Sequence, residues 1–324
     1  MNTKKAINEH IINPTTKTAR TVQVILTIAT FMFTSYYIYS NKSDFKIILN
    51  IDKVSFISLS SFFFLTSFFN AAQNAVLIRS LGVQVSNLES FGVSNISAIV
   101  NLIVPQGLTI TKAIYFKQRH KVSYSTFSAL FLGLLVIFLL IGALIMTLMN
   151  LVAAIQGVKV PAILWISSFF GIASSMLFFF DFPKGSLWKI GKVGILLESF
   201  SDGWKELRSN KRCLIEASLW QVAIFISSGI TVIIAYHSIG IDINPMLGIS
   251  LSIFISYSNL IAIIPGNIGV QESIYGYLSY ISGLMFVQGV VISALIRTIG
   301  LVITIFIAPL SWYFLFFRYK IKLR

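Results

Sequence analysis

The chain has 324 residues, of which 56% are hydrophobic and 11% are charged, and its mean hydropathy is +0.83. Soluble domains carry about 25% charged residues, so the composition excludes a soluble globular protein and predicts an all-α polytopic membrane protein. The net charge of +14 is explained by basic cytoplasmic loops, and we expect no nucleic-acid partner. The single cysteine, Cys213, excludes an internal disulfide, and with only three scattered histidines we expect no metal and no cofactor.

The predicted membrane-spanning helices are apolar stretches that approach or exceed the roughly 20 residues needed to cross a bilayer. They lie at 21–40, 54–78, 125–149, 160–180, 214–236 and 284–308. The first has no small-residue cleavage site and is interpreted as an uncleaved helix. Two further apolar segments are interrupted: 91–104 is short and ends at Pro105, and 246–264 ends at Pro265 and Gly266.

The basic residues predict the orientation of the chain. They gather in residues 1–20, 112–121, 181–212 and the tail 318–324, which places these stretches and both termini in the cytoplasm. Segment 91–104 must then enter the membrane and return to the cytoplasmic side, and 246–280 must do so from the opposite side. We therefore expect one domain, 1–324, with about six spanning helices and two oppositely oriented re-entrant hairpins. Segment 181–212 is amphipathic, and either lies on the cytoplasmic interface or is a connector packed on the protein.

The two interrupted segments resemble each other. NLIVPQGLTITKAIYF (101–116) and NLIAIIPGNIGVQESIYGY (259–277) share Asn-Leu-Ile, a proline-glycine turn and Ile-Tyr. Weak similarity with opposite entry is typical of an inverted repeat whose broken helices line a substrate site near the bilayer midplane. The alternative is a tight turn between two ordinary hydrophobic helices. The predicted turn residues are Pro105, Gly107, Pro265, Gly266 and Gly269.

A charged residue lies within the last predicted span. Arg297 at such depth costs roughly 2.5–3.5 kcal/mol on insertion scales and needs a partner, for which Glu272 is the nearest candidate. Either the two form a structural ion pair, or Arg297 contacts an anionic head group that Glu272 helps to orient. Lys112 is a further candidate contact or one more cytoplasmic lysine, and the nearby asparagines could instead be helix-packing residues. The candidate substrate-binding residues are Glu272, Arg297, Lys112, Gln271, Asn267, Asn101 and Asn259.

These motifs carry a family resemblance. NLIVPQGLTITKAIYFKQRHK and IIPGNIGVQESI resemble the two signatures of the lysylphosphatidylglycerol synthase transmembrane-region family, and Arg297 matches an arginine of its last helices. The chain differs at Gln106, where the first turn usually has glycine, and at Gln271, where the second signature has arginine. The resemblance implies a flippase-like fold with two re-entrant segments. The sequence after the last helix has no room for the soluble aminoacyltransferase domain, so we expect no synthase activity.

The leading functional hypothesis is a bacterial inner-membrane lipid or glycolipid translocase, or an accessory to one, that binds an anionic head group between the re-entrant segments. Its expected partners are membrane lipids or lipid-linked glycans and, as a further option, envelope-biosynthesis proteins. No catalytic motif is evident, so we do not expect an enzyme. The alternatives are an integral-membrane glycosyltransferase or polymerase and a scaffold for envelope polysaccharide assembly.

Overall fold

The computed structural model describes residue 39 and residues 50–103, 106–177, 204–205, 207–260, 267 and 269–319. The predicted helix 21–40, apart from Tyr39, therefore lies outside the described residues, as do most of 181–212 and residues 320–324 of the tail. Three of the predicted turn residues, Pro105, Pro265 and Gly266, also lie outside them.

Every regular element in the described part of the chain is helical, as predicted. The elements are α4 (Lys53–Arg79), α5 (Asn87–Ile103), α6 (Gly107–His120), α7 (Tyr124–Ile155), α8 (Ala162–Leu177), α10 (Lys211–His237), α11 (Pro245–Ser258), α12 (Val270–Ile281) and α13 (Phe286–Tyr319). Four of them, α4, α7, α10 and α13, are long and apolar enough to cross a bilayer, which confirms four predicted spans. In the predicted span 160–180, the described helix α8 has 16 residues and is by itself shorter than a full crossing.

Polar side chains fix where several helices begin. Ser123 precedes α7 and its hydroxyl accepts the Thr126 N–H at 3.1 Å, while the Asn244 side chain caps α11. Asp52 precedes α4 and accepts the Ser55 N–H at 2.9 Å. Hydrogen bonds from Ser55 lower the pKa of the Asp52 carboxyl. These caps set the boundaries of long apolar helices whose interiors carry few such signals.

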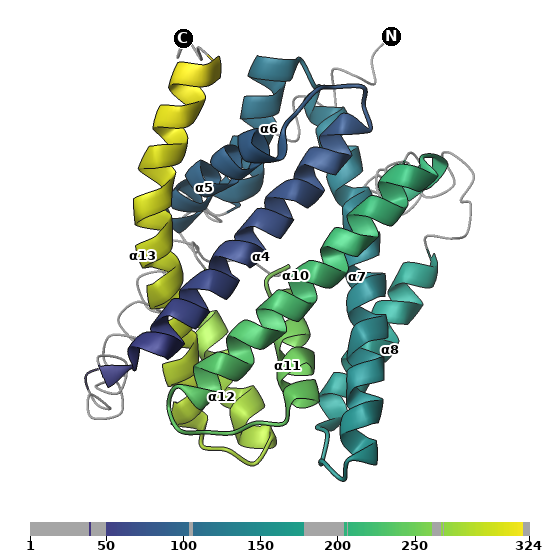
Figure 1. Cartoon of the computed structure of the whole chain (residues 1–324). Coiled ribbons are helices and arrows are strands. Elements are labelled where there is room, and N and C mark those ends of the chain that lie inside the picture. The colour runs from purple at the N-terminus through teal and green to yellow at the C-terminus, as the bar shows by residue number, and fades with distance from the viewer. Residues whose placement is uncertain are drawn as a thin grey trace, which may run out of the picture.

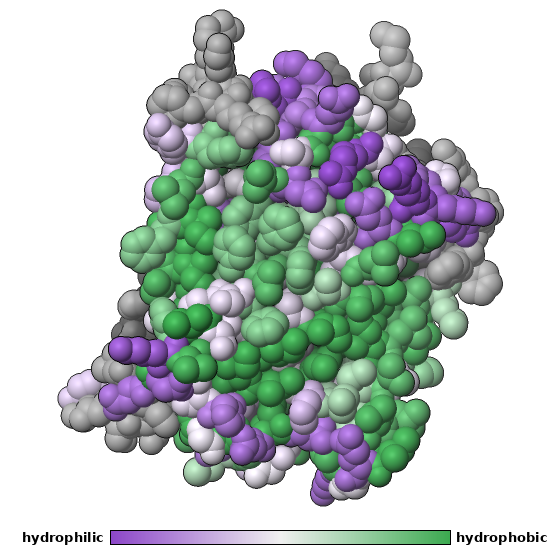
Figure 2. Space-filling view, in the orientation of Figure 1, coloured by the Kyte–Doolittle hydropathy of each residue, from purple (hydrophilic) through white to green (hydrophobic). Residues whose placement is uncertain are grey.

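The surface and the packing are those of a membrane protein. Figure 2 shows an apolar band across the middle of the visible face, with hydrophilic residues gathered at both ends. Inside, α4 packs closely against α10. Gln73 of α4 donates to Gln221 Oε1 at 3.0 Å and to the Ala217 carbonyl at 2.9 Å. In a bilayer the hydrophobic effect does not drive helices together, because lipid tails are as apolar as the side chains. Close packing and hydrogen bonds between helices hold them together instead.

The two interrupted segments form helix pairs at opposite ends of the bundle, α5–α6 at one end and α11–α12 at the other (Figure 1). At the first end, Glu89 near the start of α5 accepts from His120 at the end of α6 at 2.7 Å. At the other, Ser279 of α12 and Tyr236 near the end of α10 share a hydrogen bond between hydroxyls. Entry of the two pairs from opposite sides of the membrane, and the orientation argued from charge, stay predictions. The depth of the two pairs in a bilayer stays a prediction as well.

One boundary differs from the prediction. The sequence placed the end of the apolar segment 246–264 at Pro265, whereas α11 ends at Ser258. The next residue, Asn259, accepts hydrogen bonds from Asn267 at 3.2 Å and Gln271 at 2.6 Å. The helix therefore ends before the proline-glycine pair. The two bonds connect the end of α11 to the start of α12.

Candidate functional site

Arg297 and Glu272 form the predicted ion pair. Arg297 Nε of α13 lies 3.2 Å from Glu272 Oε1 of α12, and their side chains are 21% and 10% exposed. The other carboxylate oxygen, Oε2, accepts the Gly269 N–H at 2.6 Å and so caps the first turn of α12. Both oxygens of Glu272 are therefore occupied, one by the guanidinium and one by the backbone.

Three amide side chains complete a network around this pair. Arg297 Nη2 donates to Gln271 Oε1 at 2.8 Å and to the Asn267 carbonyl at 3.3 Å. Gln271 in turn donates to Asn259 Oδ1. Asn267 has a φ of 50°, a left-handed conformation that asparagine adopts more readily than most residues. At position 271 the glutamine oxygen accepts a hydrogen bond from Arg297, a contact that an arginine side chain could not make.

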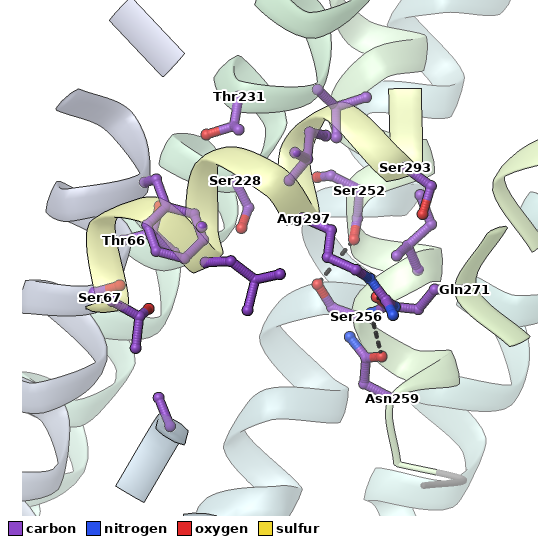
Figure 3. Close-up of a pocket in the computed structure, with 18 of the residues that line it drawn as sticks. Thr66, Ser67, Ser228, Thr231, Ser252, Ser256, Asn259, Gln271, Ser293 and Arg297 are labelled. Atoms are coloured by element: carbon purple, nitrogen blue, oxygen red, sulfur yellow. Dashed lines mark hydrogen bonds between the residues drawn. The ribbon is translucent and has the colours of Figure 1, made fainter. Parts of the chain in front are cut away.

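A cavity of about 400 Å³ lies beside the network. Figure 3 shows Arg297, Gln271 and Asn259 gathered on one side of it, with Thr66 and Ser67 of α4 across from them. Side chains from α4, α5, α6, α10, α11, α12 and α13 line it. Its polar lining consists of Thr66, Ser67, Asn101, Ser228, Thr231, Ser252, Ser256, Asn259, Gln271, Tyr275, Ser293, Arg297 and Thr304.

The first interrupted pair supplies its inner end to the same cavity. Asn101 and Leu102 of α5 and Leu108 of α6 line it, and Asn101 Oδ1 accepts the Leu108 N–H at 3.4 Å. At Gly107 a Cβ atom would lie 2.8 Å from the Val100 carbonyl, so only glycine allows α6 to start this close to α5. The inner ends of both interrupted pairs thus meet at one cavity, as an inverted repeat around a central site predicts.

Six of the seven predicted site residues take one of two positions. Asn101, Asn259, Gln271 and Arg297 line the cavity. Glu272 and Asn267 lie behind this lining, within the network that holds Arg297. A substrate-binding role for any of them stays a prediction.

Lys112 is not among the residues that line the cavity, and a role for it beside Arg297 stays a prediction. It is buried, at 4% exposure, on the face of α6 that carries Leu108 one turn earlier and Phe116 one turn later. Leu108 lines the cavity, whereas Phe116 belongs to a buried cluster that includes Ala75 and Ile78 of α4. The helical repeat places the backbone of Lys112 one turn beyond Leu108, further from the start of α6. The described part of the chain shows no hydrogen bond or ion pair for its ammonium group.

Sequence reasoning missed the serine and threonine residues of the lining. Ser252 and Ser256 stand on one face of α11 and lead to Asn259, and Ser228 and Thr231 recur at helical spacing on α10. Such spacing was a usable signal. It was weak because isolated hydroxyls are common in membrane helices, where they bond the preceding turn of their own backbone.

Comparison with known proteins gives one match. The family model described as the lysylphosphatidylglycerol synthase TM region matches residues 23–308. No curated protein matches the chain, and no solved structure does. The matched range contains both interrupted helix pairs, the cavity and Arg297.

Proposed function

Because the chain belongs to the lysylphosphatidylglycerol synthase TM region family, a flippase-like membrane domain, we propose that it is a translocase for a lipid or glycolipid. We place it in the bacterial inner membrane with both termini in the cytoplasm, because the basic stretches of the sequence favour that orientation. No synthase or transferase step is part of the proposal. Membrane lipids or lipid-linked glycans are its proposed partners.

The observation that carries the proposal is the shared cavity. Asn101 and Leu108 from the first pair and Asn259 and Gln271 from the second line it together with Arg297. Broken helices of this kind support a substrate site between the two repeats. The cavity lies near the lower end of the usual range for small-molecule pockets, about 300–1,000 Å³, so it suits a head group while the acyl or prenyl tails stay in the bilayer.

Arg297 is the proposed contact for a phosphate in that head group. Its Nε and Nη2 atoms bond Glu272, Gln271 and Asn267, and the described residues show no partner for Nη1. The free N–H groups of an otherwise fixed guanidinium suit a phosphate oxygen. Glu272 holds the guanidinium in place and offsets the cost of its charge.

We expect the purified protein, reconstituted into vesicles, to move phosphatidylglycerol with a fluorescent tail between the leaflets. Loss of signal to a membrane-impermeant quencher measures the movement. The double variant Glu272→Gln/Arg297→Gln removes both charges together, so it leaves no buried charge unpaired. We expect it to slow the movement about tenfold or more, since a charge-assisted hydrogen bond contributes roughly 1.5–3 kcal/mol.

Empty vesicles and Thr298→Val, at an exposed position outside the cavity, are the controls. If the wild-type protein moves no lipid in this assay, the translocase proposal fails. Accumulation of an undecorated glycan in a deletion strain would then favour the enzyme reading. Co-purification of a stable partner without lipid movement would favour the scaffold.

Lys112 gives a prediction in which transport falls while the stability of the protein does not. We propose that it contacts the phosphate transiently on the cytoplasmic side of the cavity, one turn of α6 beyond Leu108. Lys112→Met removes a buried ammonium group, so we expect an unchanged or higher unfolding temperature. We also expect slower transport, measured on the same reconstituted samples.

The control for Lys112→Met is Lys117→Met, on the same helix but exposed, where it stacks on Tyr124. We expect this change to leave transport close to the wild-type rate. A lower unfolding temperature together with normal transport for Lys112→Met would show that Lys112 has a structural role only.

A further inference from the structure

Hydroxyl groups dominate the polar lining of the cavity. Eight serine and threonine residues from α4, α10, α11 and α13 face it, together with the amides of Asn101, Asn259 and Gln271. Arg297 is the only charged side chain among the described lining residues, and Glu272 neutralises it from behind. The cavity is therefore polar but close to electrically neutral.

The hydroxyls present two kinds of hydrogen-bonding capacity. One half of them donate at 2.8–2.9 Å to backbone carbonyls three or four positions earlier, which leaves oxygen lone pairs as acceptors; these are Thr66, Thr231, Ser252 and Ser256. The Thr66 hydroxyl also bonds the Ser227 hydroxyl at 2.8 Å, which uses part of its capacity. The other half show no hydrogen bond in the described part of the chain and can both donate and accept; these are Ser67, Ser228, Ser293 and Thr304. A hydroxyl donates one bond and accepts two.

Ser293 shows that this lining has unmet capacity. Its residue is only 3% exposed and lines the cavity, and the described residues offer its hydroxyl no hydrogen bond. The hydroxyl oxygen is not among the fully buried polar atoms that lack a partner, so it is open to the cavity. Buried polar groups in folded proteins nearly always have a partner. A ligand or water in the cavity must supply that partner.

We infer that the head group is a phosphate-linked polyol or sugar, an inference that rests on the proposed function and names its substrate class. A polyol carries several hydroxyls that donate and accept, which matches the two kinds of lining hydroxyl. Its phosphate oxygens match the free N–H groups of Arg297. A phosphate with only an alkyl substituent would leave the hydroxyls unmatched, which costs affinity because buried polar groups then lack partners.

A cationic, aminoacylated head group does not fit this lining. The carboxylate of Glu272 is the nearest negative charge, and Arg297 and the Gly269 N–H already occupy its two oxygens. An incoming ammonium group would also meet the positive charge of Arg297.

The test compares three lipids with the same labelled tails in the vesicle assay: phosphatidylinositol, phosphatidylethanol and lysylphosphatidylglycerol. We expect phosphatidylinositol to move at least about fivefold faster than phosphatidylethanol, since one net hydrogen bond contributes roughly 1 kcal/mol. Lysylphosphatidylglycerol should move slowest. Equal rates for the three lipids, or a preference for the lysylated lipid, would overturn the inference.

Variants connect the preference to the hydroxyls. The double variant Ser293→Ala/Thr304→Val should lower the phosphatidylinositol rate about fivefold or more and leave the phosphatidylethanol rate unchanged. Thr298→Val is the matched control, because Thr298 lies on α13 as well but is exposed outside the cavity. An equal loss for both lipids would indicate a general packing defect and count against the inference.

A binding experiment separates failure of the inference from failure of the proposed function. Inositol 1-phosphate and ethyl phosphate are added to the detergent-solubilised protein, and the unfolding temperature is measured. A selective rise with inositol phosphate but no lipid movement would support the head-group class and contradict the translocase. Lipid movement with no preference between the two compounds or between the lipids would support the translocase and contradict the inferred head-group class.

Discussion

Replacing Glu272 with glutamine is expected to destabilise the protein by about 3 kcal/mol, because removing one partner of a buried ion pair typically costs about 3–5 kcal/mol and the Arg297 side chain is 21% exposed. The carboxylate accepts on both oxygens, from Arg297 Nε and from the Gly269 N–H. The amide of glutamine has one oxygen and one NH₂ group, so it leaves one of these donors facing another donor. The variant loses the neutralisation of Arg297 in any case, and in addition either the hydrogen bond to Arg297 or the cap of α12.

The single cysteine supplies the measurement for this prediction. Cys213 is buried at 5% exposure, and a thiol-reactive dye therefore reports unfolding as the side chain becomes accessible. The midpoint is compared for the wild type, Glu272→Gln, Arg297→Gln and the double variant. We expect the double variant to lose less stability than the two single losses added together, because it buries no unpaired charge. Strict additivity of the single losses would show that the pair is not energetically coupled.

Replacing Gly289 with alanine is the second change for which a large effect is expected. A Cβ atom at this position would overlap the backbone carbonyl of Tyr275 and the hydroxyl of Ser279, so α12 and α13 would have to separate. Overpacking usually costs about 1–3 kcal/mol, and we expect the upper end because backbone cannot rotate away. Arg297 lies about two turns further along α13, and the shift should pull it from Glu272 and Gln271.

The Gly289→Ala variant should therefore lose both thermal stability and most lipid transport. Gly92→Ala is the matched control: it lies within α5, and its nearest neighbours are Leu315 side-chain atoms at 3.1 Å, which can yield. We expect that variant to stay within about 1 kcal/mol of the wild type, since alanine also favours the helix. Normal transport by Gly289→Ala would contradict the view that the α12–α13 contact sets the position of Arg297.

Particular residues show how far the sequence carried the prediction of the site. The pairing of Arg297 with Glu272 followed from the cost of a lone arginine within an apolar span, a local argument that needs no coordinates. The exchange of hydrogen bonds among Asn259, Asn267 and Gln271 did not follow, because it depends on where α11 ends and how the next turn folds. The earlier end of α11 at Ser258 was missed for the same reason.

The sequence by itself determined the membrane class, four of the spanning helices, the two interrupted segments, and the need for a partner to Arg297. These properties depend on hydropathy, charge and backbone chemistry, which act over a few neighbouring residues. Only the tertiary structure decided that Asn101 and Gln271 line one cavity, that Lys112 is buried, and that hydroxyls from α4, α10, α11 and α13 complete the lining. Single serine and threonine residues are common in membrane helices. Their place in the lining is therefore visible only where helices distant in sequence pack together.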